Sequence, residues 1–316
     1  MADRFTFNPD DVHIEQALAN ISQGYRNEET VWREVAPIVR VEKRSDKYWV
    51  FDEAEHFETG EDETAPNADA RELVLRHSDD NYSVTDHARG TWVPVEAIEN
   101  ADDQLRPEGR AVEGIRRRLE LRHELRVANR MFDADTYPTD FKVTLSGTDQ
   151  WSHEDSDPVA EITNRLDTPL QRPNRLLLGV DTWRTLRQHP SVVAAVFPAG
   201  GNAAQGGLAS LQQFAELIEV ERVIVGRARH NTAAQGQTAS LARIWGKHAL
   251  LYFVEPAPQR ETATFAVTFV ESMSNIVRDF DPKKGLKGSV YVKDGWNEDV
   301  KVVSGKSAFF WEDAVA

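Results

Sequence analysis

The sequence contains no cysteine, and this absence removes several kinds of chemistry at once. Disulfide bonds, thiolate metal sites and cysteine nucleophiles are all excluded. Long hydrophobic runs are also missing. The longest, such as Val192–Phe197 and Ala249–Val254, fall far short of the roughly 20 apolar residues that cross a membrane. We therefore expect no membrane partner, and we expect stability to come from packing or from assembly with other chains.

Basic residues are in the minority. The 316 residues include 37 Lys and Arg against 52 Asp and Glu, which gives a formal net charge of −15. Such a chain does not attract nucleic acid through its overall field, so DNA contact requires a local basic face. Residues 1–10 are polar and lack the basic and then apolar pattern of a signal peptide. The protein is therefore expected to be made and used in a cytoplasm.

The acidic residues gather between two strand-like segments. Lys47–Asp52 and Tyr82–Val95 are rich in aromatic and branched residues, which favour strands. Between them, residues 51–70 hold eight acids and no Lys or Arg. The acids do not follow the spacing of a calcium-binding loop. The pattern predicts a long hairpin with an acidic, partner-facing tip. The candidate contact residues in the tip are Glu58, Glu61, Asp62 and Glu63.

The clearest helix of the sequence covers residues 104–132, with Pro107 suited to its first turn. One face of this helix carries arginine at every fourth position. These four residues are Arg118, Arg122, Arg126 and Arg130. A row of this kind contacts either phosphates or acidic side chains, and in a crowded assembly acidic neighbours are favoured.

The rest of the chain predicts an α+β protein. Residues 31–42 read as an extended edge segment because they contain Pro37. Strand and helix patterns then alternate between residues 141 and 254, as in an α/β core. Extended sequence returns in residues 262–270 and 288–303.

No catalytic, cofactor-binding or metal-binding residues are expected. Gly201, Gly206 and Gly207 precede a helix but do not have the spacing of a phosphate-binding loop. The nine histidines lack the spacing of a zinc site. An α/β enzyme built on residues 175–254 is therefore a remote alternative.

Four stretches resemble the major capsid proteins of tailed bacteriophages of the Hong Kong 97 type, whose fold encapsulin shells share. Residues 43–57 (KRSDKYWVFDEAEHF) are similar to the start of that family's extended loop. Residues 172–190 (RPNRLLLGVDTWRTLRQHP), 217–236 (LIEVERVIVGRARHNTAAQG) and 244–258 (IWGKHALLYFVEPAP) are similar to segments of its axial domain. Together and in this order, the matches cover most of residues 35–258.

The resemblance implies four parts. These are an N-terminal arm (1–40), an extended loop (41–95), a peripheral domain (96–150 with 260–316) that contains the spine helix 104–132, and an axial domain (151–259). It implies a structural protein, not an enzyme. Copies would form pentamers and hexamers, assemble in the host cytoplasm into an icosahedral virion head, and enclose double-stranded DNA by weak, non-specific contact.

The resemblance also implies a portal partner and a possible scaffolding or decoration partner. No Lys lies between Tyr48 and Phe141, so lysine crosslinking from the extended loop is not expected. The chain begins without a long helical prodomain, so any scaffold would be a separate protein. An encapsulin-like compartment with a protein cargo remains the alternative to a phage head.

Overall fold

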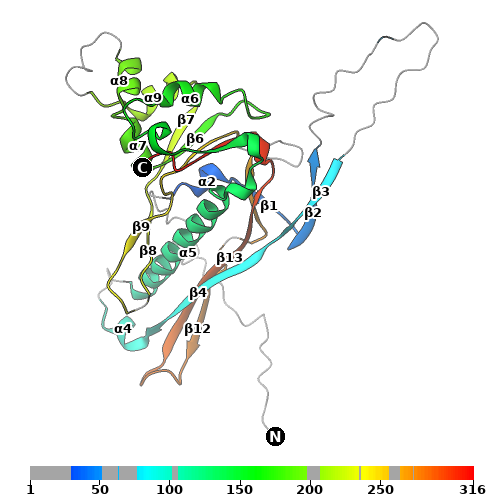
Figure 1. Ribbon diagram of the computed structural model, residues 1–316. Coiled ribbons are helices and arrows are strands. Elements are labelled where there is room, and N and C mark those ends of the chain that lie inside the picture. The colour runs from blue at the N-terminus through cyan, green and yellow to red at the C-terminus, as the bar shows by residue number, and fades with distance from the viewer. Residues whose placement is uncertain are drawn as a thin grey trace.

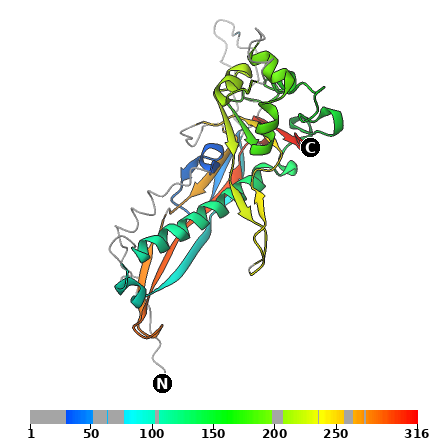
Figure 2. The same cartoon turned by 90° about the vertical axis from the view of Figure 1, so that its left-hand side faces the viewer.

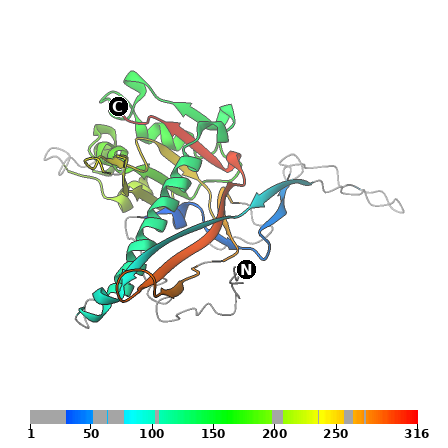
Figure 3. The ribbon, with the colours of Figure 1, turned by 90° about the horizontal axis from the view of Figure 1, so that it is seen from below.

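The computed structural model describes residues 30–51, 63, 77–101, 106–197, 207–234, 236–255, 264–272 and 274–316. Two bodies and a projection make up this part of the chain (Figure 1). An upper lobe holds short helices around a sheet, and a lower, elongated body has one long helix along a second sheet. Seen from below in Figure 3, a two-stranded hairpin extends away from both.

Five strands form the sheet of the upper lobe, in the order β5-β14-β10-β6-β7. β6 pairs with β7 in parallel, and β10 runs antiparallel to both β6 and β14. β6, β7 and β10 are nearly continuous apolar runs, as expected of strands buried on both faces. The strands are β5 (Lys142–Thr144), β6 (Arg175–Gly179), β7 (Arg222–Gly226), β10 (Ala249–Tyr252) and β14 (Ala308–Glu312).

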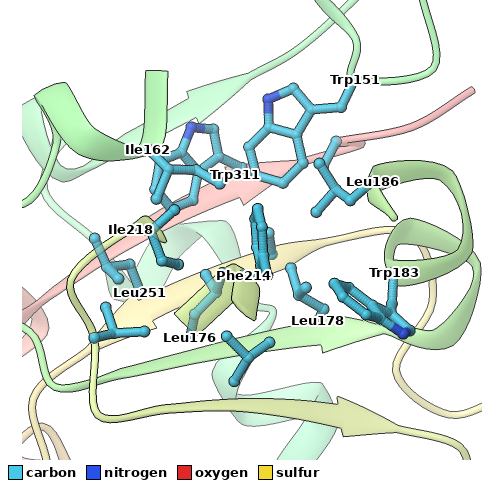
Figure 4. Packing of buried hydrophobic residues seen from close by; sticks show 14 of the residues in the cluster. Trp151, Ile162, Leu176, Leu178, Trp183, Leu186, Phe214, Ile218, Leu251 and Trp311 are labelled. Atoms are coloured by element: carbon cyan, nitrogen blue, oxygen red, sulfur yellow. The ribbon is translucent and has the colours of Figure 1, made fainter. Parts of the chain in front are cut away.

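Four short helices enclose the apolar core of this lobe. They are α6 (Pro158–Asn164), α7 (Val180–Leu186), α8 (Pro190–Val196) and α9 (Leu211–Leu217). Figure 4 shows Trp151 and Trp311 packed with aliphatic side chains from the sheet and the helices. Both indole N–H groups donate to the carboxylate of Glu161, at 3.0 and 2.9 Å. The two tryptophans therefore bury their rings and still satisfy their polar atoms.

The long strand β13 (Ser289–Val302) organises the lower body. It pairs antiparallel with β4 (Thr85–Pro94), β11 (Ala266–Val270) and β12 (Val277–Asp281), and β1 (Ile38–Arg40) joins β11 in parallel. The long helix α5 (Pro107–Met131) lies along this sheet (Figure 2). Its Val112, Ile115 and Leu119 belong to one apolar cluster with Val292 and Trp296 of β13. At about 1.5 Å per residue, α5 is roughly 37 Å long.

Two hairpins leave these bodies. The first joins β2 (Ser45–Phe51) to β3 (His77–Ser83) and projects to the side. The second joins β8 (Arg229–Asn231) to β9 (Leu241–Arg243) and extends beside α5 in Figures 1 and 2. An isolated two-stranded hairpin is only marginally stable in water. Inside the subunit, β2–β3 gains support at its base, where Tyr48 and Tyr82 pack on Phe269.

The remaining helical elements connect these parts. α2 (Trp32–Val35) precedes β1, and α4 (Val95–Glu99) follows β4. Turns of 3-10 helix occupy Ala134–Thr136, Thr139–Phe141, Gly147–Asp149 and Gly305–Ser307. None of the helices in the described residues is both long and apolar enough to cross a membrane.

The structure confirms the α+β architecture and the long helix. A projecting hairpin is present, but its second strand is β3, and most of the predicted second strand, Tyr82–Val95, is β4, which pairs with β13 instead. The prediction of an extended segment over residues 31–42 is wrong at its start, because Trp32–Val35 form a helical turn. Trp32, Val35 and Ala36 are buried there, so tertiary packing overrides the local pattern. β14 lies in the sheet of the upper lobe, although residues 260–316 are assigned to the peripheral domain from sequence. The division into domains stays a prediction.

Candidate assembly surfaces

The predicted arginine row lies on α5, but its members have different surroundings. Arg118, Arg122 and Arg130 are exposed. Within the described residues, Arg118 and Arg122 form no ion pair. Arg126 is half-buried and donates hydrogen bonds to Glu298 of β13, one of them from Nε at 2.9 Å. The structure therefore leaves three guanidinium groups of the row at the surface, and it uses the fourth inside the subunit.

Glu298 is the centre of a buried polar cluster between α5 and the sheet. Besides Arg126, it accepts a hydrogen bond from the indole of Trp296 at 2.5 Å and lies 2.6 Å from Nδ1 of His123. Burial alone would raise the pKa of Glu298. Its partners, His123 and Arg126, outweigh burial and lower the pKa to about 2. Burial lowers the pKa of His123, so its ring is neutral at neutral pH. Glu298 is therefore ionised at physiological pH, and it connects α5 to β13.

A second buried cluster of charges lies about two turns before His123 on α5. Arg116 places its guanidinium 4.4 Å from the ring centre of Trp296, between Glu120 at 3.5 Å and Asp294 at 3.7 Å. Burial lowers the pKa of Arg116, but a guanidinium stays charged at any physiological pH. The inward side of α5 therefore carries charges whose partners lie within the subunit.

The predicted acidic residues lie mostly beyond the described part of the chain. Glu58, Glu61 and Asp62 lie outside the described residues, and Glu63 is exposed. The structure does describe the base of the same hairpin, and there charged side chains of β2 and β3 pair with each other. Lys47 reaches Asp79 at 3.1 Å, and Tyr48 donates to Asp80 at 2.5 Å. The charge of Arg130 is one of the influences that lower the pKa of Asp80, after the hydrogen bond from Tyr48.

Sequence reasoning missed a patch of exposed apolar side chains at the lower end of the β12–β13 sheet. Leu286 is 93% exposed and Phe280 is 50% exposed. Trp92 of β4 is also exposed, at 37%, and the Nζ atom of Lys284 lies 3.9 Å from its ring centre. The signal in the sequence is a single leucine between lysines in a glycine turn, residues 283–288 (KKGLKG). Exposed apolar side chains grouped in this way are typical of contact surfaces.

The described residues contain no group of three or more His, Asp or Glu side chains that could hold a metal ion. Of the three glycines considered for a phosphate-binding loop, Gly201 and Gly206 lie outside the described residues, and Gly207 lies within them. What the described chain offers is a projecting hairpin, an arginine-bearing helix face and an apolar tip. These are elements suited to contacts between proteins.

Comparisons with known proteins agree with this picture, although no family model matches the chain. The chain is similar to the major capsid protein of Pseudomonas phage JBD67. The two are 36% identical over 306 residues, which cover 96% of this chain and 97% of that protein. In structure it is similar to a phage-related protein from Bordetella bronchiseptica, with a TM-score of 0.74, 23% identity and coverage of 95% and 97%. It is also similar to the capsid of cyanophage P-SCSP1u, with a TM-score of 0.60, 11% identity and coverage of 92% and 89%.

Proposed function

The chain belongs to the family of phage major capsid proteins, and from this premise we propose how its copies hold one another in the shell. Its role is structural, its fold is of the Hong Kong 97 type, and its place is the virion capsid. One observation on α5 carries the proposal. Arg126 is hydrogen-bonded to Glu298 inside the subunit, whereas Arg118 and Arg122 are exposed at the surface.

We propose that the acidic tip of the extended loop of one copy lies against the arginine face of the next. The acidic side is Glu58, Glu61, Asp62 and Glu63, and the basic side is Arg118, Arg122 and Arg130. Arg126 supports this face from within, through Glu298. An exposed ion pair contributes only about 0–1 kcal/mol, but a closed shell repeats it many times. Weak single contacts also allow a wrongly docked subunit to leave.

The finer partners follow from the family and are part of the proposal. Copies form pentamers and hexamers, and they assemble in the host cytoplasm. A portal protein occupies one position in the shell, and a scaffolding or decoration protein is a further candidate partner. Packaged double-stranded DNA touches the shell weakly and without sequence preference, since the net charge of the chain is −15.

The test is a charge swap between the two surfaces. The double variant Arg118→Glu/Arg122→Glu is expected to yield few or no closed shells by negative-stain microscopy and sedimentation. Adding Glu61→Arg/Asp62→Arg is expected to restore them. Raising the salt from about 0.1 M to about 1 M should weaken assembly of the natural protein, because exposed pairs are screened.

The matched control is Arg184→Glu, which changes an exposed arginine that pairs with Asp181 within α7. It should assemble like the natural protein. If the α5 variant forms normal shells, or if the second pair of changes brings no recovery, the proposed contact is wrong. The capsid role of the family would still stand.

A further inference from the structure

The β8–β9 hairpin lies in a stretch of the chain that has no acidic residue. No Asp or Glu occurs between Glu221 and Glu255, although the chain as a whole carries a net charge of −15. The same stretch places Arg227 just before β8, Arg229 in β8 and Arg243 in β9. The hairpin is therefore positively charged on a negatively charged protein.

The three arginines lie on the outer side of this hairpin. Side chains alternate between the two sides of a strand. Ala228 and Ile244 are buried in an apolar cluster to which α5 also contributes, so they mark the inner side. Arg227 and Arg229 alternate with Ala228 and are exposed. Arg243 pairs directly with Arg229 across the two strands, and its guanidinium donates to the backbone carbonyl of Arg227 at 3.2 Å.

This arrangement of charge is unfavourable for the hairpin on its own. Like charges directly opposite each other destabilise a pair of strands, as Arg229 and Arg243 do here. A two-stranded hairpin is in any case only marginally stable in water. Within the described chain, neither Arg227 nor Arg229 forms an ion pair with a carboxylate. Two exposed arginines beside a third positive charge indicate an anionic partner outside the subunit.

The turn of the hairpin indicates which anion fits. Its first strand ends at Asn231, whose side-chain oxygen accepts the backbone N–H groups of Ala233 and Ser240 at 3.1 and 2.9 Å. Leu241, 64% exposed, is the one large apolar side chain among the described residues of 229–243. Interfaces between proteins have apolar centres rich in aromatic residues. Contacts to nucleic-acid phosphates instead combine arginine with hydroxyl and amide side chains, which is the composition found here.

We propose that the outer side of the β8–β9 hairpin binds the phosphate backbone of packaged double-stranded DNA, through Arg227 and Arg229 with Arg243 beside them. The inference rests on the proposed function, in which the shell encloses DNA. A chain of net charge −15 needs a local basic face for such a contact, and the hairpin supplies it. The hairpin extends beside α5 (Figure 2), and this side of the subunit therefore faces the interior of the shell. A few phosphate contacts in each subunit are weak singly and are repeated around the shell.

The experiment measures binding of the unassembled full-length protein to a fluorescent DNA duplex of about 20 base pairs, by anisotropy from about 20 mM to about 200 mM salt. Arg227→Gln/Arg229→Gln should bind more weakly, and equally so for duplexes of unrelated sequence. The slope of log K against log salt should become shallower by about two, one for each lost phosphate contact. Because both side chains are exposed, the variant should fold like the natural protein.

The matched control is Arg172→Gln/Arg184→Gln. It removes the same charge from two exposed arginines that have ion pairs within the subunit. Its affinity for the duplex and its salt slope should equal those of the natural protein. A second readout needs no variant, because the duplex should protect Arg227 and Arg229 of the natural protein from modification by phenylglyoxal and should leave Arg184 reactive.

No binding of the natural protein at about 20 mM salt would overturn the inference, and so would equal salt slopes for the hairpin variant and the control. The competing partner is another protein, represented by a synthetic peptide of the acidic residues 51–70. If this peptide protects the hairpin arginines and DNA does not, the hairpin is a contact between subunits and the DNA assignment is wrong.

Shell formation separates this inference from the proposed loop contact. Arg227→Gln/Arg229→Gln should form closed shells like the natural protein, whereas Arg118→Glu/Arg122→Glu should not. Loss of shells in the hairpin variant would also overturn the DNA assignment. Normal shells in the α5 variant would overturn only the loop contact, because DNA binding by the hairpin is measured on unassembled protein.

Discussion

Arg122 and Arg126 lie four residues apart on α5, yet one is exposed and the other is bound to a buried carboxylate of β13. The same contrast runs along the helix. On its buried side, Arg116, Glu120 and Glu124 find their partners inside the subunit, in β13 and in α2. Away from the sheet, Arg118 and Arg122 have no ion pair in the described chain.

Charged residues on the two sides of α5 therefore have different roles. A buried pair is costly to form, but removing one partner leaves the other without compensation, so such pairs fix the geometry of the subunit. An exposed arginine contributes little to folding and is free to contribute to assembly. The inward side of α5 should therefore control stability, and the outward side should control assembly.

The largest effect is expected for Glu298→Ala. The change leaves Arg126, His123 and Trp296 without their common acceptor, and loss of one partner of a buried pair costs about 3–5 kcal/mol. Urea unfolding of the unassembled subunit measures it. A loss below about 1 kcal/mol would place this cluster among ordinary surface pairs.

The pH dependence of the same cluster comes next. The pKa of Glu298 is lowered from 4.5 to about 2, so its contribution is complete above about pH 4.5 and is lost as the pH falls towards 2. The shift corresponds to roughly 3 kcal/mol. The stability difference between the natural protein and Glu298→Gln should shrink over this range. A difference that is constant from neutral pH down to acid would contradict the assignment.

Arg126→Ala should have an intermediate effect. Hydrogen bonds to a charged partner contribute about 1.5–3 kcal/mol, and Glu298 keeps His123 and Trp296 when Arg126 is removed. The free energy of unfolding should fall by about that amount. Equal losses for Arg126→Ala and Arg122→Ala would remove the distinction between the two sides of the helix.

The smallest effect on stability is expected for Arg122→Ala. Exposed substitutions away from special features change stability by about 0.5 kcal/mol or less. Arg122→Ala should instead lower the yield of assembled shells at low salt, which sedimentation measures. A large loss of folding stability with unchanged assembly would reverse the roles assigned to the two sides.

The sequence predicts the long helix and the α/β core, because each has a local pattern of its own. Pro107 at the first helical position and the apolar runs of β6 and β10 are examples. The sequence does not reveal that Arg126 differs from Arg122, since the residue that distinguishes them, Glu298, is 172 positions away in the chain. The helical turn at Trp32–Val35 is hidden for the same reason, because it depends on packing and on Glu120 and Glu124.

The most direct test is a high-resolution electron microscopy reconstruction of shells assembled from the purified protein. The account predicts closed shells in which density from the acidic loop of a neighbouring copy lies on Arg118 and Arg122, while Arg126 remains on Glu298. Shells in which no neighbouring subunit touches Arg118 and Arg122, or a protein that stays monomeric under all assembly conditions, would contradict it.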